Sequence, residues 1–168
     1  MDNLEQAACV VARDVDGRPA FIELDHQVQR VASGISASWF WTTDQAPRLP
    51  ADIGQQPAGR TFPGPGGSKF GLVSLPAHSD GTMAGAGSAQ PVSAGMTMND
   101  ASSGMHATRS VDFEIIVSGR IVLELPGGAS RVLGPGDSVV LAGVAHRWYN
   151  PFDEACVYAA FILGAEAR

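Results

Sequence analysis

The stretch VDFEIIVSGRIVLELPGGASRVLGPGDSVVLAG, residues 111–143, decides the fold. It consists of short apolar segments rich in β-branched residues, and turn signals separate them at intervals of roughly 8 to 12 residues. Pro126-Gly127-Gly128 predicts a hairpin between two strands, and the GPGD sequence at 134–137 predicts a second tight turn. The pattern therefore predicts an all-β chain folded as a sandwich or a barrel.

The same pattern continues on both sides of this stretch. Further strands are expected at CVVARD (9–14), AFIELD (20–25), SASWFWTTD (36–44), KFGLVSLPA (69–77) and ACVYAAFILG (155–164). The Asp and Gly residues of DVDGRP, residues 14–19, predict a turn between the first two. No convincing amphipathic helix interrupts the series. Residues 79–104, rich in Gly, Ser, Ala and Met, are expected to form a flexible loop, because so long an irregular segment is usually a lid, a binding loop or disordered.

Composition and charge limit the partners. The 168 residues suffice for one domain, and 45% of them are hydrophobic. The net charge is −6, the arginines stand singly and Lys69 is the only lysine, so we expect no nucleic-acid partner. No apolar run of about 18 residues could span a membrane, and the N-terminus lacks the pattern of a secretory signal. We therefore expect a cytoplasmic protein in which Cys9 and Cys156 are reduced and buried.

Four residues suggest a site. His106, Thr108 and Asp112 have the same parity, so on an extended chain they point to one face. Forty residues later His146 lies in another strand-like segment. Two imidazoles and a carboxylate that converge inside a barrel would form an open three-ligand metal site. Spacing alone does not show that they converge.

The first of two sequence motifs contains three of these four residues. The segment GMHATRSVDFEIIVSGR, residues 104–120, resembles the first motif of the cupin superfamily. His106 matches its first histidine, Thr108 stands where the second histidine belongs, and Asp112 takes the place of the glutamate. Gly119 closes the motif at the expected distance.

The segment GPGDSVVLAGVAHRWYN, residues 134–150, resembles the second cupin motif. Gly136, His146 and Asn150 match it, and Ala142 and Val144 replace its proline and glycine. The H-x-T-x-S-x-D-F string further resembles a group of small single-domain bacterial and fungal cupins, in which threonine at this position is usual.

The resemblance implies an architecture. It predicts a double-stranded β-helix, the jelly-roll barrel, with an extended N-terminal β arm. The whole chain, 1–168, would be one cupin domain, with the arm and first strands at 1–75, the flexible loop at 79–104 and the motif core at 105–163. Cupins of this size often form dimers with N-terminal strands packed across the interface, so a homodimer is expected.

The resemblance also implies a chemistry. His106, Asp112 and His146 would bind a divalent transition metal (iron, manganese, nickel or zinc), and no organic cofactor is expected. Asp112 and Glu114 are the candidate catalytic carboxylates, although Glu114 could instead pair with an arginine such as Arg120. Thr108, a poor metal ligand, and Trp148 would line a substrate pocket, although Trp148 could equally serve core packing.

Two functions stay open. The first is a metal-dependent enzyme of the dioxygenase, isomerase or dehydratase type that acts on an apolar or aromatic small molecule. The second is a metal-free barrel that binds or senses a small ligand without catalysis. The step from fold to either function rests on analogy.

Overall fold

The computed structural model describes residues 3–32, 34–48, 62–82, 96–100 and 103–166. Within these residues the chain is built from β-strands, preceded by a short 3-10 helix η1 (Asn3–Gln6). The first strands are β1 (Cys9–Val15), β2 (Arg18–Leu24), β3 (Val28–Ala32), β4 (Ile35–Thr43), β5 (Ser68–Leu75) and β6 (Met96–Asp100). The remainder are β7 (Met105–Thr108), β8 (Ser110–Ser118), β9 (Ile121–Glu124), β10 (Ser130–Leu133), β11 (Ser138–Ala142), β12 (Arg147–Tyr149) and β13 (Cys156–Gly164). The prediction of an all-β fold is confirmed.

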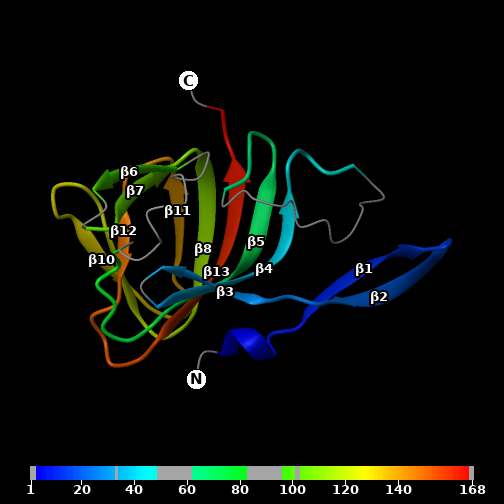
Figure 1. Ribbon diagram of the computed structural model, residues 1–168, viewed down its shortest axis with the longest axis horizontal. Helices are drawn as coiled ribbons and strands as arrows, with labels where there is room; N and C mark the ends of the chain where they lie inside the picture. The colour runs from blue at the N-terminus through cyan, green and yellow to red at the C-terminus, as the bar shows by residue number, and fades with distance from the viewer. Residues whose placement is uncertain (1–2, 33, 49–61, 83–95, 101–102, 167–168) are drawn as a thin grey trace.

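Two antiparallel sheets form the body of the molecule (Figure 1). The larger has six strands in the order β11-β8-β13-β5-β4-β3, and the smaller has three in the order β10-β9-β12. Buried and more exposed residues alternate along β8 and β13, because successive side chains of a strand point to opposite faces. The inward residues of both sheets meet in one core, which includes Ile116, Ile121, Leu141, Cys156 and Ala160. The sheets thus enclose a common interior.

The predicted turns are present. Val15 pairs with Arg18, which leaves Asp16 and Gly17 as a two-residue hairpin loop, and both have positive φ. Glu124 pairs with Ser130 across the Pro-Gly-Gly turn. In the GPGD turn the Asp137 carboxylate accepts the backbone N–H of Gly134 at 2.8 Å.

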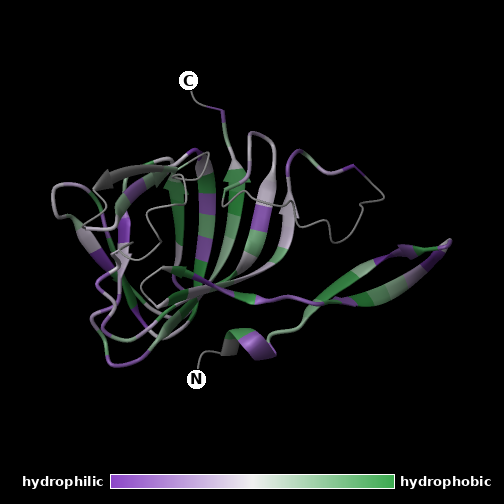
Figure 2. Ribbon diagram, viewed as in Figure 1, coloured by the Kyte–Doolittle hydropathy of each residue, from purple (hydrophilic) through white to green (hydrophobic). Residues whose placement is uncertain are grey.

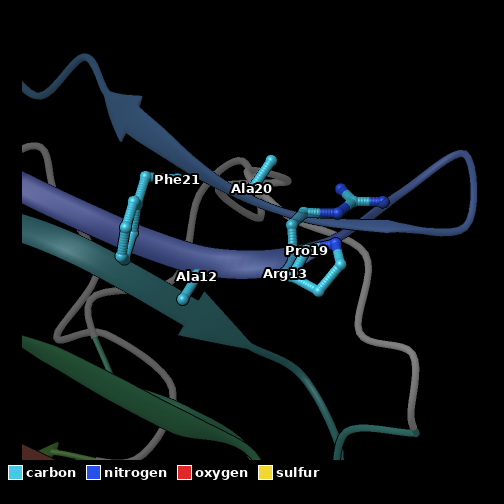
Figure 3. Close-up of a pocket in the computed structure, with 5 residues that line it drawn as sticks. All are labelled: Ala12, Arg13, Pro19, Ala20 and Phe21. Carbon is cyan, nitrogen blue, oxygen red and sulfur yellow. The ribbon is translucent and has the colours of Figure 1, made fainter.

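The N-terminal hairpin is the predicted β arm. Strands β1 and β2 pair with each other in a separate two-stranded sheet and project away from the barrel (Figure 1). An open hollow of about 300 Å³ lies on this hairpin and is lined by Ala12, Arg13, Pro19, Ala20 and Phe21. Figure 3 shows these five side chains. Phe21 is 82% exposed. The hairpin therefore presents apolar surface at a distance from the core.

The segment 79–104 differs from the predicted loop in part. Residues 96–100 form strand β6, which pairs with β7, so this part is ordered by a neighbouring strand rather than by its own composition. Ser79 makes an isolated β-bridge with Asn150. Residues 83–95 and 101–102 lie outside the described residues.

Two smaller expectations can be compared with the structure. Cys9 and Cys156 are both free thiols, and Cys156 is buried. Cys9 is only half-buried, because it lies on the arm. In the part of the chain that the structure describes, no helix has the length and apolar character needed to cross a bilayer.

Candidate functional site

The structure brings His106 and His146 together. They face each other in an isolated antiparallel β-bridge, with His106 on β7 and His146 just before β12. The backbone N–H of His106 donates to the carbonyl of His146 at 2.9 Å, and the reverse hydrogen bond is 2.8 Å long. Side chains directly opposite each other in such a pair lie on the same face. Their ring centroids are accordingly 4.5 Å apart.

Each ring is held by a backbone carbonyl. Nδ1 of His106 lies 2.9 Å from the carbonyl oxygen of Gly104, and Nδ1 of His146 lies 2.9 Å from that of Val144. A carbonyl oxygen can only accept a hydrogen bond, so Nδ1 carries the proton in both rings. Nε2 therefore keeps its lone pair in both histidines, which is the tautomer that a metal or a proton-donating ligand requires.

Burial keeps both imidazoles neutral. It lowers the pKa of His106, against the opposing effects of the Gly104 carbonyl and of Asp112. Burial and the neighbouring His106 lower the pKa of His146 to about 4. At neutral pH the pair therefore offers two unprotonated nitrogens.

Asp112 lies at the end of a short hydroxyl chain. The Ser110 hydroxyl donates to Thr108 Oγ1 at 2.8 Å, and the Thr108 hydroxyl donates to Asp112 Oδ2 at 3.2 Å. Thr108 thus orients the carboxylate, even though the strand is interrupted at Arg109, between β7 and β8. Asp112 Oδ1 is buried and has no hydrogen-bond partner among the described residues. Burial raises the pKa of Asp112, while the two hydroxyls and His106 oppose this effect.

Glu114 is the second inward carboxyl group on β8. It is 6% exposed, and in the part of the chain that the structure describes its Oε2 atom has no hydrogen-bond partner. Burial, and then the charge of Asp112, raise its pKa to about 8. Arg120 contacts Glu154 instead, at 3.9 Å, so it is not the ion-pair partner considered for Glu114. Figure 2 shows the hydrophilic bands that interrupt the otherwise hydrophobic β8.

Trp148 both packs in the core and borders the histidine pair. It is 7% exposed, stacks on Tyr158 with centroids 5.6 Å apart, and meets the His146 ring edge-on at 6.4 Å. The core-packing role considered for Trp148 is therefore present, and its role as a wall of a substrate pocket stays a prediction. Tyr158 was not predicted from the sequence, although it shares the parity of its buried neighbours Cys156 and Ala160 on β13.

The proposed three-ligand set is not assembled in the structure. Among the described residues, no three His, Cys, Asp or Glu side chains lie close enough together to hold a metal ion. Two imidazole lone pairs and an unpartnered carboxylate oxygen nevertheless suit a divalent transition metal in donor type. The metal site that includes Asp112 thus stays a prediction.

A charged residue that sequence reasoning did not assign to the site also lies inside. Lys69 on β5 is 6% exposed and shares the parity of the buried Val73 and Leu75. That parity is readable from the sequence. A lysine beside a glycine-rich stretch is ordinarily solvent-exposed, which hides the signal.

Asn150 has the structural role expected of a turn residue. Its side chain is fully buried, donates to the carbonyls of Leu75 and Glu154, and accepts the backbone N–H of Phe152. It joins the chain after β12 to the end of β5 and does not contact the histidines in the hydrogen bonds described.

The antiparallel sheets that pack on one core are consistent with the predicted jelly-roll barrel. Membership of the cupin superfamily, which the two motifs resemble, stays a prediction. The subgroup stays a prediction. No family model matches the chain.

Two curated proteins of fungal biosynthesis clusters are similar to parts of the chain. Oryzines biosynthesis cluster protein J of Aspergillus oryzae is 37% identical over 57 residues, which cover 34% of this chain and 32% of that protein. Phomopsin biosynthesis cluster protein C′ of Diaporthe leptostromiformis is 44% identical over 46 residues, covering 27% and 24%. The chain therefore spans a third or less of these relatives.

Among the solved structures that the chain matches is a Cupin 2 conserved barrel domain protein from Salinispora arenicola. It has a TM-score of 0.47 and 18% identity, and the match covers 81% of both chains. An RmlC-like cupin from Shewanella frigidimarina has a TM-score of 0.46 and 12% identity, covering 84% of this chain and 86% of that one.

Proposed function

We propose that this protein is a small-molecule enzyme of the cupin type, in which His106 and His146 bind a divalent transition metal and Asp112 completes the site. The observation that carries the proposal is the matched pair of rings. Both Nδ1 atoms are committed to backbone carbonyls, so both Nε2 lone pairs are available. A metal bound there would polarise a carbonyl or enolate or activate oxygen, which fits dioxygenase, isomerase or dehydratase chemistry.

Other residues of the site would transfer protons, orient Asp112 and exclude water. With a pKa of about 8, Glu114 holds a proton at neutral pH and can deliver it to a substrate or take it back. The Ser110–Thr108 chain holds Asp112 in one orientation. Trp148, packed on Tyr158, excludes water beside His146 and offers an apolar wall.

An apolar or aromatic substrate suits such a wall. The similarity of part of the chain to proteins of the oryzines and phomopsin biosynthesis clusters supports a role in the biosynthesis of a small molecule. The limited coverage leaves the reaction itself to experiment.

The test is elemental analysis of the untagged protein after reconstitution with iron, manganese, nickel or zinc. The parent should retain close to one equivalent of metal, and a His106→Ala/His146→Ala double variant should retain only background. His78→Ala is the matched control, since His78 is exposed and pairs with Asp153 at 3.2 Å. Equal background in the parent and the double variant overturns the metal proposal.

One observation favours a second function, a metal-free barrel that binds a small ligand. It is that the described residues bring no third ligand to the two histidines. In that case Nε2 of each histidine would accept a hydrogen bond from the ligand. The double variant would then weaken ligand binding while the metal content of all proteins stayed at background.

We also propose that the chain forms a homodimer through its arm and the outer face of the six-stranded sheet. Phe70, Phe161 and Phe113 lie opposite one another on β5, β13 and β8, and each is about 40% exposed. The arm adds Phe21, and an isolated two-stranded hairpin is marginally stable in water. A second copy of the chain would cover both apolar surfaces at once.

A further inference from the structure

Arg147 is fixed on the face of β12 opposite to the buried Trp148. It is the first residue of this strand and is directly opposite Glu124 of β9. Its Nη2 and Nε atoms donate to Glu124 Oε2 at 2.8 and 3.3 Å. Its guanidinium also lies 4.9 Å from the centroid of the Tyr149 ring. The carboxylate and the ring together hold the guanidinium against the small sheet.

The remaining nitrogen of this guanidinium contacts the turn that precedes β7. Nη1 of Arg147 donates to the carbonyl of Ser103 at 3.5 Å, a long contact that the charge of the donor strengthens. Ser103 is followed by Gly104, whose carbonyl accepts the Nδ1 proton of His106. The contact made by Arg147 therefore ends one residue away from the group that sets the tautomer of His106.

Backbone packing holds the same turn through a second contact with β12. A Cβ on Gly104 would lie 2.0 Å from the carbonyl oxygen of Gly81, and a Cβ on Gly81 would lie 1.8 Å from that of Trp148. The two glycines thus let three backbone segments stack closely. Consecutive residues of β12, Arg147 and Trp148, therefore support the turn by one polar contact and one steric contact.

The charge of Arg147 also acts on the segment around Gly81. The neighbouring Asp80 carboxylate accepts the backbone N–H and the hydroxyl of Thr82, both at 2.9 Å. These two hydrogen bonds lower the pKa of Asp80, and the charge of Arg147 lowers it further. Arg147 is therefore close to both of the segments that stack on β12.

The two histidine rings depend on different supports. The proton of a neutral imidazole stays on the nitrogen that has an acceptor, so His106 keeps Nδ1–H only while the Gly104 carbonyl is in place. Nδ1 of His146 is held by the carbonyl of Val144, which makes no contact with Arg147 in the hydrogen bonds described. A change at the Arg147 side chain should therefore affect one ring and spare the other.

We propose that Arg147 is a positioning residue that acts through the turn before β7: by holding this turn, it keeps the Gly104 carbonyl on Nδ1 of His106. The use of the free Nε2 lone pair for a metal rests on the proposed function. The tautomer itself is a property of the metal-free protein, so the two ideas fail separately.

Ring-nitrogen NMR of the metal-free protein tests this role. Long-range ¹H–¹⁵N correlation spectra distinguish Nδ1–H from Nε2–H, and single substitutions assign the 4 histidines. His106 and His146 should both show Nδ1–H in the parent. In Arg147→Met the Nδ1 proton of His106 should exchange with water about 10-fold faster and the Nε2–H form should appear, because a hydrogen bond from a charged group is lost. His146 should keep its spectrum.

Arg120→Met is the matched control. Arg120 also pairs with a glutamate, Glu154, at 3.9 Å, and its guanidinium lies 4.1 Å from the centroid of the Phe152 ring. Its loss should leave both histidine rings unchanged. Arg147→Lys should restore part of the parent spectrum of His106, because an ammonium group keeps the charge but lacks the forked geometry of a guanidinium.

The outcomes separate positioning from general stability. An unchanged His106 in folded Arg147→Met overturns the proposal, and so does an equal change in both rings. If Arg147→Met does not fold, Glu124→Gln decides, since it keeps Arg147 and removes only the charge that anchors it. The Nδ1 proton of His106 should then exchange faster than in the parent, and an unchanged rate overturns the proposal. A parent that binds no metal bears on the proposed function alone.

Discussion

His106 and His146 are reciprocal partners: each donates its backbone N–H to the other's carbonyl, and each directs Nδ1 to the carbonyl of the residue two positions earlier. The two rings therefore have the same tautomer for the same reason. Protonation of either Nε2 would place a charge in a buried setting beside the other ring.

The first prediction concerns the stability of the protein at acid pH. The pKa of His146 is about 4 in the folded chain, whereas an unfolded histidine titrates near 6.5, so between these values the unfolded state binds more protons. The free energy of unfolding should therefore rise with pH from 4 to 6.5. Relative to His146→Asn, the rise should be on the order of 2–3 kcal/mol, measured by urea unfolding in the presence of a chelator. If the free energies of unfolding of the parent and of His146→Asn changed with pH in parallel, the low pKa assigned to His146 would be wrong.

For Glu114 we expect the opposite trend, a free energy of unfolding that falls as the pH rises. Its pKa is about 8 in the fold, above the ordinary value near 4.5, so the folded state holds the extra proton between these limits. Its contribution to stability is present below pH 4.5 and is lost as the pH rises through 8. Glu114→Gln should remove this slope, with a gain of several kcal/mol over the parent at pH 8 in urea unfolding. The exposed Glu154→Gln should leave the slope as it is.

Gly104 should resist substitution. Its φ is +74°, and a Cβ there would lie 2.0 Å from the carbonyl oxygen of Gly81. Gly104→Ala must move the loop whose carbonyl orients His106, so it should destabilise the fold by roughly 2 kcal/mol or more and weaken metal binding. Gly128 also has a positive φ (+85°) but faces open space, so Gly128→Ala should cost about 1 kcal/mol with no effect on metal binding. Thermal unfolding and metal titration of both variants provide the measurement.

Asn150 should be a stability residue without a part in chemistry. Asn150→Ala removes one acceptor and two donors from buried backbone partners, and should cost roughly 3 kcal/mol in chemical unfolding. Asn150→Asp keeps the acceptor for Phe152 but loses both donors, so it should not restore the stability that Asn150→Ala loses. Metal binding by the folded fraction should match that of the parent, and a selective loss of metal would show that the role is wrongly assigned.

The dimer proposal is tested by two surface changes. Phe21→Ser on the arm and Phe113→Ser on the outer sheet face each remove exposed apolar area without touching the core. Each should shift the dimer towards monomer by at least 10-fold in dissociation constant, measured by analytical ultracentrifugation. An exposed valine outside both surfaces, Val132→Ser on β10, is the control. A parent that sediments as a monomer would overturn the proposal.

The strands and turns were predictable because their signals are local. Asp16-Gly17 and the Pro-Gly-Gly turn fix the hairpin loops by their backbone requirements alone. Parity also placed Thr108 and Asp112 on one face, and the hydrogen bond between their side chains shows that they meet although β7 and β8 belong to different sheets.

The remainder depends on contacts between distant strands. His106 and His146 belong to segments 40 residues apart, and no spacing rule predicts that these segments meet. Strand β6 escaped prediction because its order comes from pairing with β7. Lys69 was missed because its burial follows from the central place of β5 in the six-stranded sheet, which the surrounding glycines do not reveal.

The use of backbone carbonyls to fix both histidine tautomers has an evolutionary consequence. Gly104 and Val144 contribute carbonyl oxygens, so a different side chain at Val144 leaves the lone pair of His146 in place. Side chains around the pair can therefore diverge without altering the protonation of the two rings. Descendants of such a chain can change their surroundings while they inherit the same two neutral histidines.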